Sequence, residues 1–272
     1  MSKNSSRPLE YRNRGVDKLC LGVLLAMLPG LLCGTRAHAQ SVELHVAAAA
    51  DLQPVMPALA AAYQQKTSVK IVTSFGSSAT LEQQLQNGDP QDVFLSADFL
   101  HPEQLVAAGL TDGKPPVPYA RGLLVLWARK DSPAQPLTLD SLKKPSVTKI
   151  AVANDLHAPY GMAATRALKN LNLTATVADK LVVGENVTQT AQFALSGNAQ
   201  AAFISMTIAS SQPFRDAGTY VRIPDSSYPP IRQCAVILKA SQQQAAAHVF
   251  LDWLTSKEVQ QNLKSFGLDP AE

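Results

Sequence analysis

The 272-residue chain is poor in cysteine and in charged residues, which make up 17% of it, and it has no catalytic signature motif. Two of the three cysteines, Cys20 and Cys33, lie in the N-terminal segment and leave Cys234 alone, which excludes an intrachain disulfide and a cysteine metal cluster. G-x-S-x-G, the P-loop and G-x-G-x-x-G are missing, and no histidine has metal-ligand spacing to another histidine or cysteine. These absences disfavour the common hydrolase, nucleotide and metal sites.

Residues 1–39 have the pattern of a secretory signal rather than of a folded segment. A basic stretch precedes the apolar run Leu19–Gly34, which a proline interrupts, and Ala37-His38-Ala39 follows as an A-x-A cleavage site. The run is too short to span a membrane comfortably. Lipid attachment at Cys33 is disfavoured by the bulky leucine before it. We therefore expect a signal peptide over 1–39 and a mature protein in the periplasm.

The positive net charge of the chain comes from the predicted signal peptide. Without residues 1–39, six of the 24 Lys and Arg and two of the 21 Asp and Glu are lost, which leaves 18 bases and 19 acids. A mature chain with a net charge of −1 gives no support to nucleic-acid or anionic-membrane binding.

The mature chain alternates short strand-like runs with amphipathic helical runs, which is typical of a parallel, doubly wound α/β sheet. The first helix has Pro54 in its first turn, and the last is expected to break near Thr255-Ser256. Strands are expected at 42–50, 68–75, 92–98, 122–129, 149–155, 180–186, 201–206, 220–225 and 231–239, and helices at 52–67, 79–88, 102–109, 160–170, 188–200 and 242–266.

Two proline-rich loops, 111–120 and 226–230, indicate paired crossings between two lobes. The first lobe is then discontinuous, with residues 40–120 plus 228–272, and the second has residues 121–227. We expect mixed, mostly parallel sheets with a ligand cleft between the lobes.

Five junctions between a strand and the following helix carry the functional signal. Ligands of open α/β sheets lie where strands end and helix N-termini present free N–H groups. Each junction alone reads as ordinary helix capping, but together they offer backbone N–H groups and hydroxyls to an ionised anion that needs no countercharge. The junctions are 47–53, 74–81, 154–164, 184–191 and 203–209, and none contains a lysine or arginine.

An enzyme is the weaker interpretation. Ser78 with His157 is the one conceivable serine–histidine pair, and it predicts a hydrogen bond of roughly 3 Å between the two side chains. The sequence supplies no third member of a triad, so we predict that the protein is not an enzyme.

Over nearly its whole mature length the chain resembles the periplasmic molybdate-binding proteins of ABC importers. The resemblance rests on VAAAADL, SFGSSATLEQQLQNGDPQDVFLSAD, HAPYG, GENVTQTAQFALSGNAQAAF and the terminal SFGLDP. It implies a two-lobed periplasmic-binding-protein fold that closes on molybdate or tungstate without a cofactor or a cation site. It also implies a monomer that serves a membrane permease with an ATPase. Another small solute, such as sulfate, an organic acid or a polyol, is the alternative ligand.

The resemblance assigns the ligand donors one residue at a time. Ser78 matches the serine that gives a hydroxyl and an N–H, with Ser77 as support. Tyr160 matches the residue between proline and glycine that gives an N–H, and Val187 matches the N–H donor at the start of the next helix.

Two positions depart from the family pattern. Asp51 stands where the family often has serine, and a carboxylate about 4 Å from a dianion costs on the order of 2 kcal/mol even in water. We expect Asp51 to turn back and cap its own helix; otherwise it marks a different ligand with a hydroxyl or amine to donate. Ser205 stands where a tyrosine hydroxyl is frequent, and it is shorter by a ring.

Overall fold

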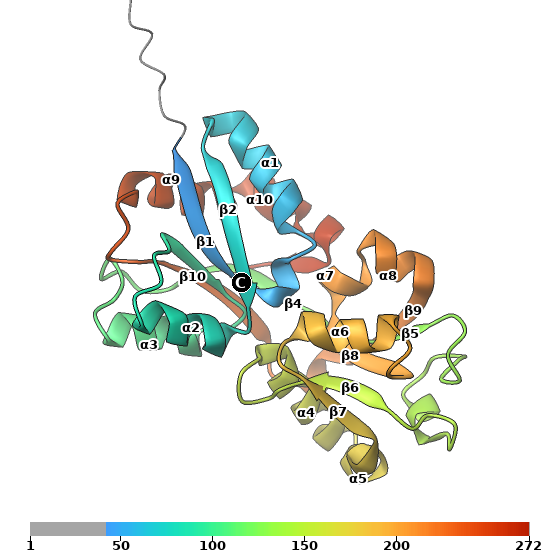
Figure 1. Ribbon diagram of the computed structural model, residues 1–272. Coiled ribbons are helices and arrows are strands. Elements are labelled where there is room, and N and C mark those ends of the chain that lie inside the picture. The colour runs from blue at the N-terminus through green and yellow to red at the C-terminus, as the bar shows by residue number, and fades with distance from the viewer. Residues whose placement is uncertain (1–41, 272) are drawn as a thin grey trace, which may run out of the picture. The chain divides into compact units, whose positions relative to one another are not determined.

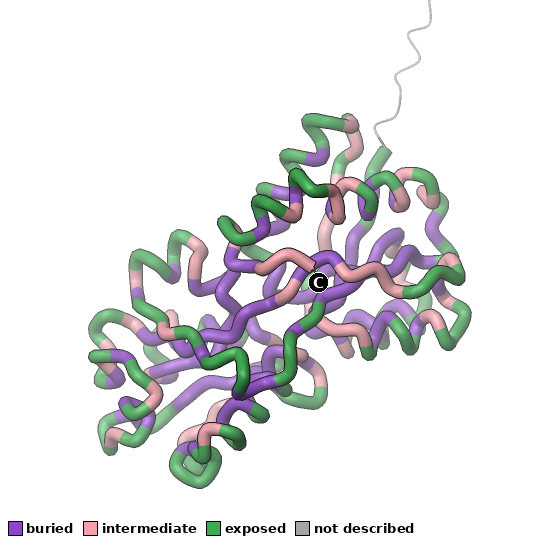
Figure 2. Tube along the Cα trace, turned by 180° about the vertical axis from the view of Figure 1, so that it is seen from behind, coloured by how far each residue is buried: buried purple, intermediate pink, exposed green. Residues whose placement is uncertain are grey.

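The computed structural model describes residues 42–271, which form two mixed α/β sheets covered by helices (Figure 1). The predicted signal peptide, 1–39, with Cys20 and Cys33, lies outside the described residues. Within the described part, no helix has the length and apolar character needed to cross a membrane. Figure 2 shows that buried residues follow the strands and that exposed residues gather on the helices and loops outside them.

The first sheet belongs to the first lobe and has the strand order β11-β4-β10-β3-β1-β2. Leu44 and Val46 of β1 face one apolar cluster with α1 and α9, whereas Ala47 faces another with α2 and α3, as period-two alternation requires. Its strands are β1 Glu43–Ala49, β2 Lys70–Gly76, β3 Val93–Ser96, β4 Val117–Gly122, β10 Ile231–Ile237 and β11 Leu268–Pro270. Its helices are η1 Ala50–Leu52, α1 Met56–Thr67, α2 Ser78–Gln86, α3 Leu100–Ala107, α9 Gln244–Leu254, α10 Lys257–Asn262 and η5 Leu263–Phe266.

The second sheet has the order β7-β6-β8-β5-β9. Its core is built around the buried Trp127, whose ring meets Phe214 edge-on at 5.1 Å. Its strands are β5 Leu124–Arg129, β6 Ile150–Ala153, β7 Leu181–Gly184, β8 Ala201–Ser205 and β9 Gly218–Arg222. Its helices are η2 Asp140–Lys143, α4 Pro159–Asn170, α5 Thr174–Val177, η3 Ala178–Lys180, α6 Val187–Leu195, α7 Met206–Ala209, α8 Gln212–Ala217 and η4 Asp225–Ser227.

The chain passes between the sheets twice. The first passage is at Leu123, between β4 and β5, and the second runs from Ile223 to Pro230, between β9 and β10. Because β4 continues to Gly122, the first sheet extends two residues beyond the boundary expected at residue 120.

The two-lobed α/β class with mixed sheets is confirmed, but the expected predominance of parallel pairing is wrong. Of the nine strand pairings among the described residues, four are parallel and five antiparallel. Four of the antiparallel pairings involve β5 or β10, the strands that follow a passage between the lobes, and the fifth joins β11 to β4.

Local details of the sequence interpretation also need correction. Pro54 precedes α1, and Pro57 occupies its first turn instead. Residues 111–120, expected as a loop, contain most of β4, and the pairing of β4 with β10 skips Tyr119, next to Pro118, as a bulge in β4 does. The predicted break of the last helix is confirmed, since Ser256 accepts the Val259 N–H and starts α10.

Candidate functional site

Four of the five predicted junctions meet around one small cavity between the lobes. The first lobe contributes the end of β1 and the turn before α2, and the second contributes the starts of α4 and α6. The cavity volume is about 10 Å³, so it holds about one water-sized sphere and a four-oxygen anion requires the walls to separate. Its lining is Ala49, Ala50, Asp51, Gly76, Ser77, Ser78, Ala97, Ala158, Pro159, Tyr160, Asn186 and Val187.

Three helices present their first available N–H group at this cavity. Ser78 and Val187 are the first residues of α2 and α6, and in α4 the first residue is Pro159, so Tyr160 has the first N–H. Such groups have no partner within their own helix. The caps leave them free too, because the Asn186 side chain takes the next two N–H groups of α6 rather than that of Val187.

Ser77 and Ser78 have different roles: Ser77 caps α2, and Ser78 is the first residue of that helix and lines the cavity. Ser77 caps α2 by accepting the Thr80 N–H at 3.2 Å. Ser78, which is fully buried, accepts the Ala97 N–H at 3.1 Å through its hydroxyl oxygen. The hydroxyl hydrogen of Ser78 is not used in that bond, and Ser78 lines the cavity, so its expected role as a ligand donor stays a prediction.

The glycine of the P-x-G turn allows α4 to start close to the strand end. A Cβ on Gly161 would lie 2.5 Å from the Ala153 carbonyl oxygen and 2.6 Å from that of Asn154. Any larger residue would push the helix start, and with it the Tyr160 N–H, away from the cavity.

The Asp51 side chain does not cap its own helix, so the capping role that we expected for it is wrong. It lies inside η1, is 1% exposed and lines the cavity. Its Oδ2 accepts hydrogen bonds from Gln233 Nε2 at 2.6 Å and from the Tyr160 hydroxyl at 3.1 Å. Its Oδ1 has no hydrogen-bond partner among the described residues. The carboxyl group is thus a buried part of the cavity wall.

Burial has the largest effect on the pKa of the Asp51 carboxyl. Desolvation raises the pKa of Asp51 from 3.8 to about 7, against the hydrogen bonds from Gln233 and Tyr160, which lower it. Burial, followed by the charge of Asp51, raises the pKa of the Tyr160 phenol well above its usual value. Tyr160 is therefore a neutral donor, and Asp51 changes charge close to neutral pH.

Side chains of the second lobe also donate hydrogen bonds to main-chain carbonyl groups of the first lobe. Thr188 Oγ1 donates to the Ala50 carbonyl at 3.0 Å, and Thr207 Oγ1 donates to the Asp51 carbonyl at 2.6 Å. In the opposite direction the Ala79 N–H donates to the His157 carbonyl at 3.2 Å. These bonds fix the two walls of the cavity against each other.

Ser205 caps a helix and does not line the cavity. It is fully buried, its hydroxyl lies 2.7 Å from Thr207 Oγ1, and it accepts the Ile208 N–H. The shorter side chain explains why it stays with its own helix. Its link to the site is indirect and runs through Thr207.

The geometry contradicts the serine hydrolase interpretation. His157 directs Nδ1 at Glu185 Oε1, 3.1 Å away. Among the hydrogen bonds of the described residues, none joins Ser78 to His157. Cys234 is buried, and desolvation raises the pKa of its thiol, so it is not an alternative nucleophile.

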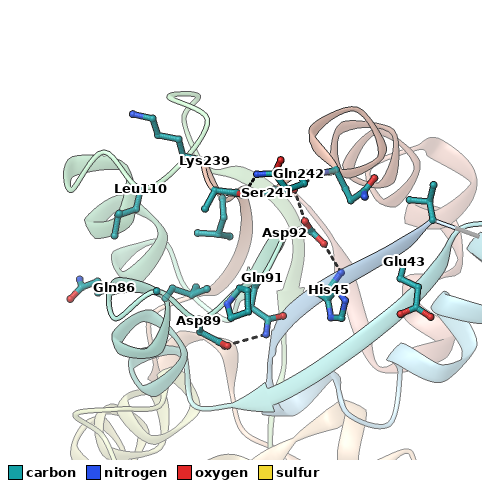
Figure 3. A pocket seen from close by; sticks show the side chains of 17 residues that line it. Glu43, His45, Gln86, Asp89, Gln91, Asp92, Leu110, Lys239, Ser241 and Gln242 are labelled. Atoms are coloured by element: carbon teal, nitrogen blue, oxygen red, sulfur yellow. Dashed lines mark hydrogen bonds between the residues drawn. The ribbon is translucent and has the colours of Figure 1, made fainter. Parts of the chain in front are cut away.

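A much larger hollow lies elsewhere. It has a volume of about 1270 Å³ and contains Glu43 and His45 from the beginning of β1, whereas the small cavity lies where β1 ends (Figure 3). Its central acid, Asp92, is already satisfied by the His45 N–H and the Ser241 hydroxyl.

Two residues of the site escape the sequence interpretation: Gln233 and Thr188. Gln233 is the polar residue within the otherwise apolar core of β10, and this is the one signal that could have pointed to it. Tyr160 was expected to act through its N–H alone, whereas its hydroxyl also reaches Asp51.

Comparison with known proteins adds an independent finding. The family described as bacterial extracellular solute-binding protein matches residues 44–269. The molybdate-binding protein ModA of Azotobacter vinelandii is 36% identical over 253 residues, covering 90% of this chain and 96% of that protein. ModA of Rhodobacter capsulatus is 32% identical, covering 87% and 92%.

Solved structures agree. The periplasmic molybdate-binding protein of Azotobacter vinelandii superposes with a TM-score of 0.76 at 30% identity, covering 84% of this chain and all of that one. The sulfate-binding protein SubI of Mycobacterium tuberculosis has a TM-score of 0.70 at 16% identity, covering 85% and 88%, and supports the fold alone.

Proposed function

Since the chain belongs to the bacterial extracellular solute-binding proteins, we propose that it captures a tetrahedral oxyanion, molybdate or tungstate, for an ABC importer. The observation that carries this is the convergence of three unpaired helix N–H groups, from Ser78, Tyr160 and Val187, on a cavity lined by no lysine or arginine. The names of the relatives supply the choice of anion.

Fixed neutral donors suit this ligand. A helix N-terminus carries about half a positive charge, so three of them together offset much of a dianion. The donors are held before the ligand arrives, because caps and buried contacts fix the starts of α2, α4 and α6. Entry and release then follow from hinge motion of the lobes at the two passages between the sheets.

A second candidate is a small solute with a hydroxyl or amine group. The observation in its favour is the buried Asp51, whose unpaired oxygen would accept a hydrogen bond from such a ligand. The same screen that tests the oxyanion discriminates between the two.

The biological setting is the importer that this family serves. We propose that the mature protein works in the periplasm as a monomer, without a cofactor and without bond chemistry, and hands its ligand to a permease driven by an ATPase. Molybdenum or tungsten is then cargo rather than a resident metal.

The decisive experiment is a thermal-shift and calorimetric screen of molybdate, tungstate, sulfate, phosphate and a neutral polyol at about pH 6. A ligand present at a thousand times its Kd stabilises the folded protein by about 4 kcal/mol. We expect this with molybdate and tungstate. Binding of none of the anions would refute the proposal, and binding of the polyol instead would establish the second candidate.

A further inference from the structure

Asp51, a residue of the cavity lining, has one carboxyl oxygen without a hydrogen-bond partner among the described residues. Asp51 is 1% exposed and lines the cavity. Gln233 Nε2 and the Tyr160 hydroxyl both donate to Oδ2, which leaves Oδ1 unpaired among the described residues. A buried acceptor without a donor is costly, and such groups are rare in folded proteins.

No cation compensates the carboxylate, because the ion pairs of residues 42–271 do not include it. Of the neighbouring elements, α6 and α7 contain no charged residue, and the charged residue of β2, Lys70, pairs with Glu43. Tyr160 of α4 and Tyr119 of β4 have a phenol pKa raised well above the usual value, and both face it as neutral groups. The charged groups of the surrounding elements have other partners. The Glu185 carboxyl contacts Thr80 and His157. Arg121 pairs with Asp269, and the Arg232 guanidinium lies over the Phe99 ring.

Resting on the proposed function, we propose that the site binds its oxyanion together with one proton, which Asp51 holds on Oδ1. The carboxylic acid then donates a hydrogen bond to an anion oxygen, while Oδ2 keeps its two donors. In this form Asp51 joins Ser78, Tyr160 and Val187 as a fourth donor instead of repelling the ligand.

Two consequences follow. Burial sets the pKa of Asp51 to about 7 in the ligand-free protein, so above that pH the site must acquire the proton when it binds, and affinity falls about tenfold per pH unit. A wall made only of donors also favours a fully ionised anion over one that carries its own hydroxyl, because that hydroxyl finds no acceptor. Asp51 is thus a specificity-determining residue.

The test is calorimetry with molybdate on the wild-type protein and on Asp51→Asn, at about pH 6 and about pH 8.5, in pairs of buffers with different ionisation enthalpies. For the wild type we expect uptake of close to one proton at the higher pH and little at the lower, and an affinity about thirtyfold weaker at the higher pH. For Asp51→Asn we expect no uptake, a flat affinity and tighter binding than the wild type at the higher pH.

Glu185→Gln is the matched control, because Glu185 is an acid at the rim whose carboxyl contacts Thr80 and His157 but does not line the cavity. It should retain the proton uptake of the wild type. Molybdate binding without uptake, or uptake that persists in Asp51→Asn, would overturn the proton-coupled role and leave the proposed function standing. Absence of molybdate binding at both pH values would refute both.

Discussion

Asp51→Asn should stabilise the ligand-free protein in a way that depends on pH. Asparagine keeps the shape of the side chain and has no charge to bury. The pKa of Asp51 is raised from 3.8 to about 7 by burial, so the folded protein binds a proton there more tightly than the unfolded chain does. Stability from this group is therefore fully present below about pH 4 and is lost as the pH rises to about 7.

The magnitude follows from that shift. A difference of about three pH units, at 1.36 kcal/mol per unit, is about 4 kcal/mol of unfolding free energy. For a chain of this size each kcal/mol moves Tm by about 2–4 °C. Asp51→Asn should thus match the wild type near pH 4 and melt about 10 °C higher near pH 8.

The assay is urea unfolding and differential scanning calorimetry of both proteins without ligand, from about pH 4 to about pH 8. Asp179→Asn is the control at an exposed acid, and it should leave Tm close to that of the wild type. Parallel stability curves for the wild type and Asp51→Asn would refute the claim that the carboxyl is buried without a compensating charge.

Three further changes probe the cavity wall. Ser78→Ala removes a hydroxyl donor and leaves a buried main-chain N–H unpaired, so urea unfolding should show a loss of about 1–3 kcal/mol and calorimetry a weaker oxyanion affinity. Gly122→Ala would place a Cβ 2.2 Å from the Tyr160 hydroxyl, so it should weaken binding about tenfold or more, with partial recovery in Gly122→Ala/Tyr160→Phe. Thr188→Val removes a bond between the lobes worth about 1 kcal/mol, so stopped-flow should show about fivefold faster release.

The helix starts that form the site could be predicted because their signals are local. Ser77 and Asn186 are N-caps within a few residues of the N–H groups they satisfy, and the proline of the P-x-G turn fixes the start of α4. The carboxyl ends of parallel strands bring such starts to one edge of a sheet. The sequence therefore predicted which helix starts meet at the cavity, whereas the donor roles of Ser78, Tyr160 and Val187 come from the family resemblance and stay a prediction.

The partners of Asp51 could not be predicted in this way, because they are set by tertiary packing. Its hydrogen bonds come from residues 109 and 182 positions away in the chain, on the other lobe and on the returning strand β10. The preference of aspartate for helix N-caps led to the wrong expectation that the Asp51 side chain caps its own helix. Likewise, Pro118 is predicted as a loop residue unless the bulge at Tyr119 of β4, which depends on pairing with the distant β10, is known.

Asp51 differs from a neutral polar residue at the same position because its side chain can change charge. An asparagine at this position would fill the same volume, accept the same two hydrogen bonds from Gln233 and Tyr160, and cost the folded protein no charge burial at neutral pH. The aspartate lines the cavity, keeps that cost and leaves Oδ1 without a hydrogen-bond partner among residues 42–271. Buried groups that break the usual rules of polar satisfaction gather at functional sites. A carboxyl whose proton is needed only when an anion is present ties ligand capture to pH, which a permanently neutral amide cannot do.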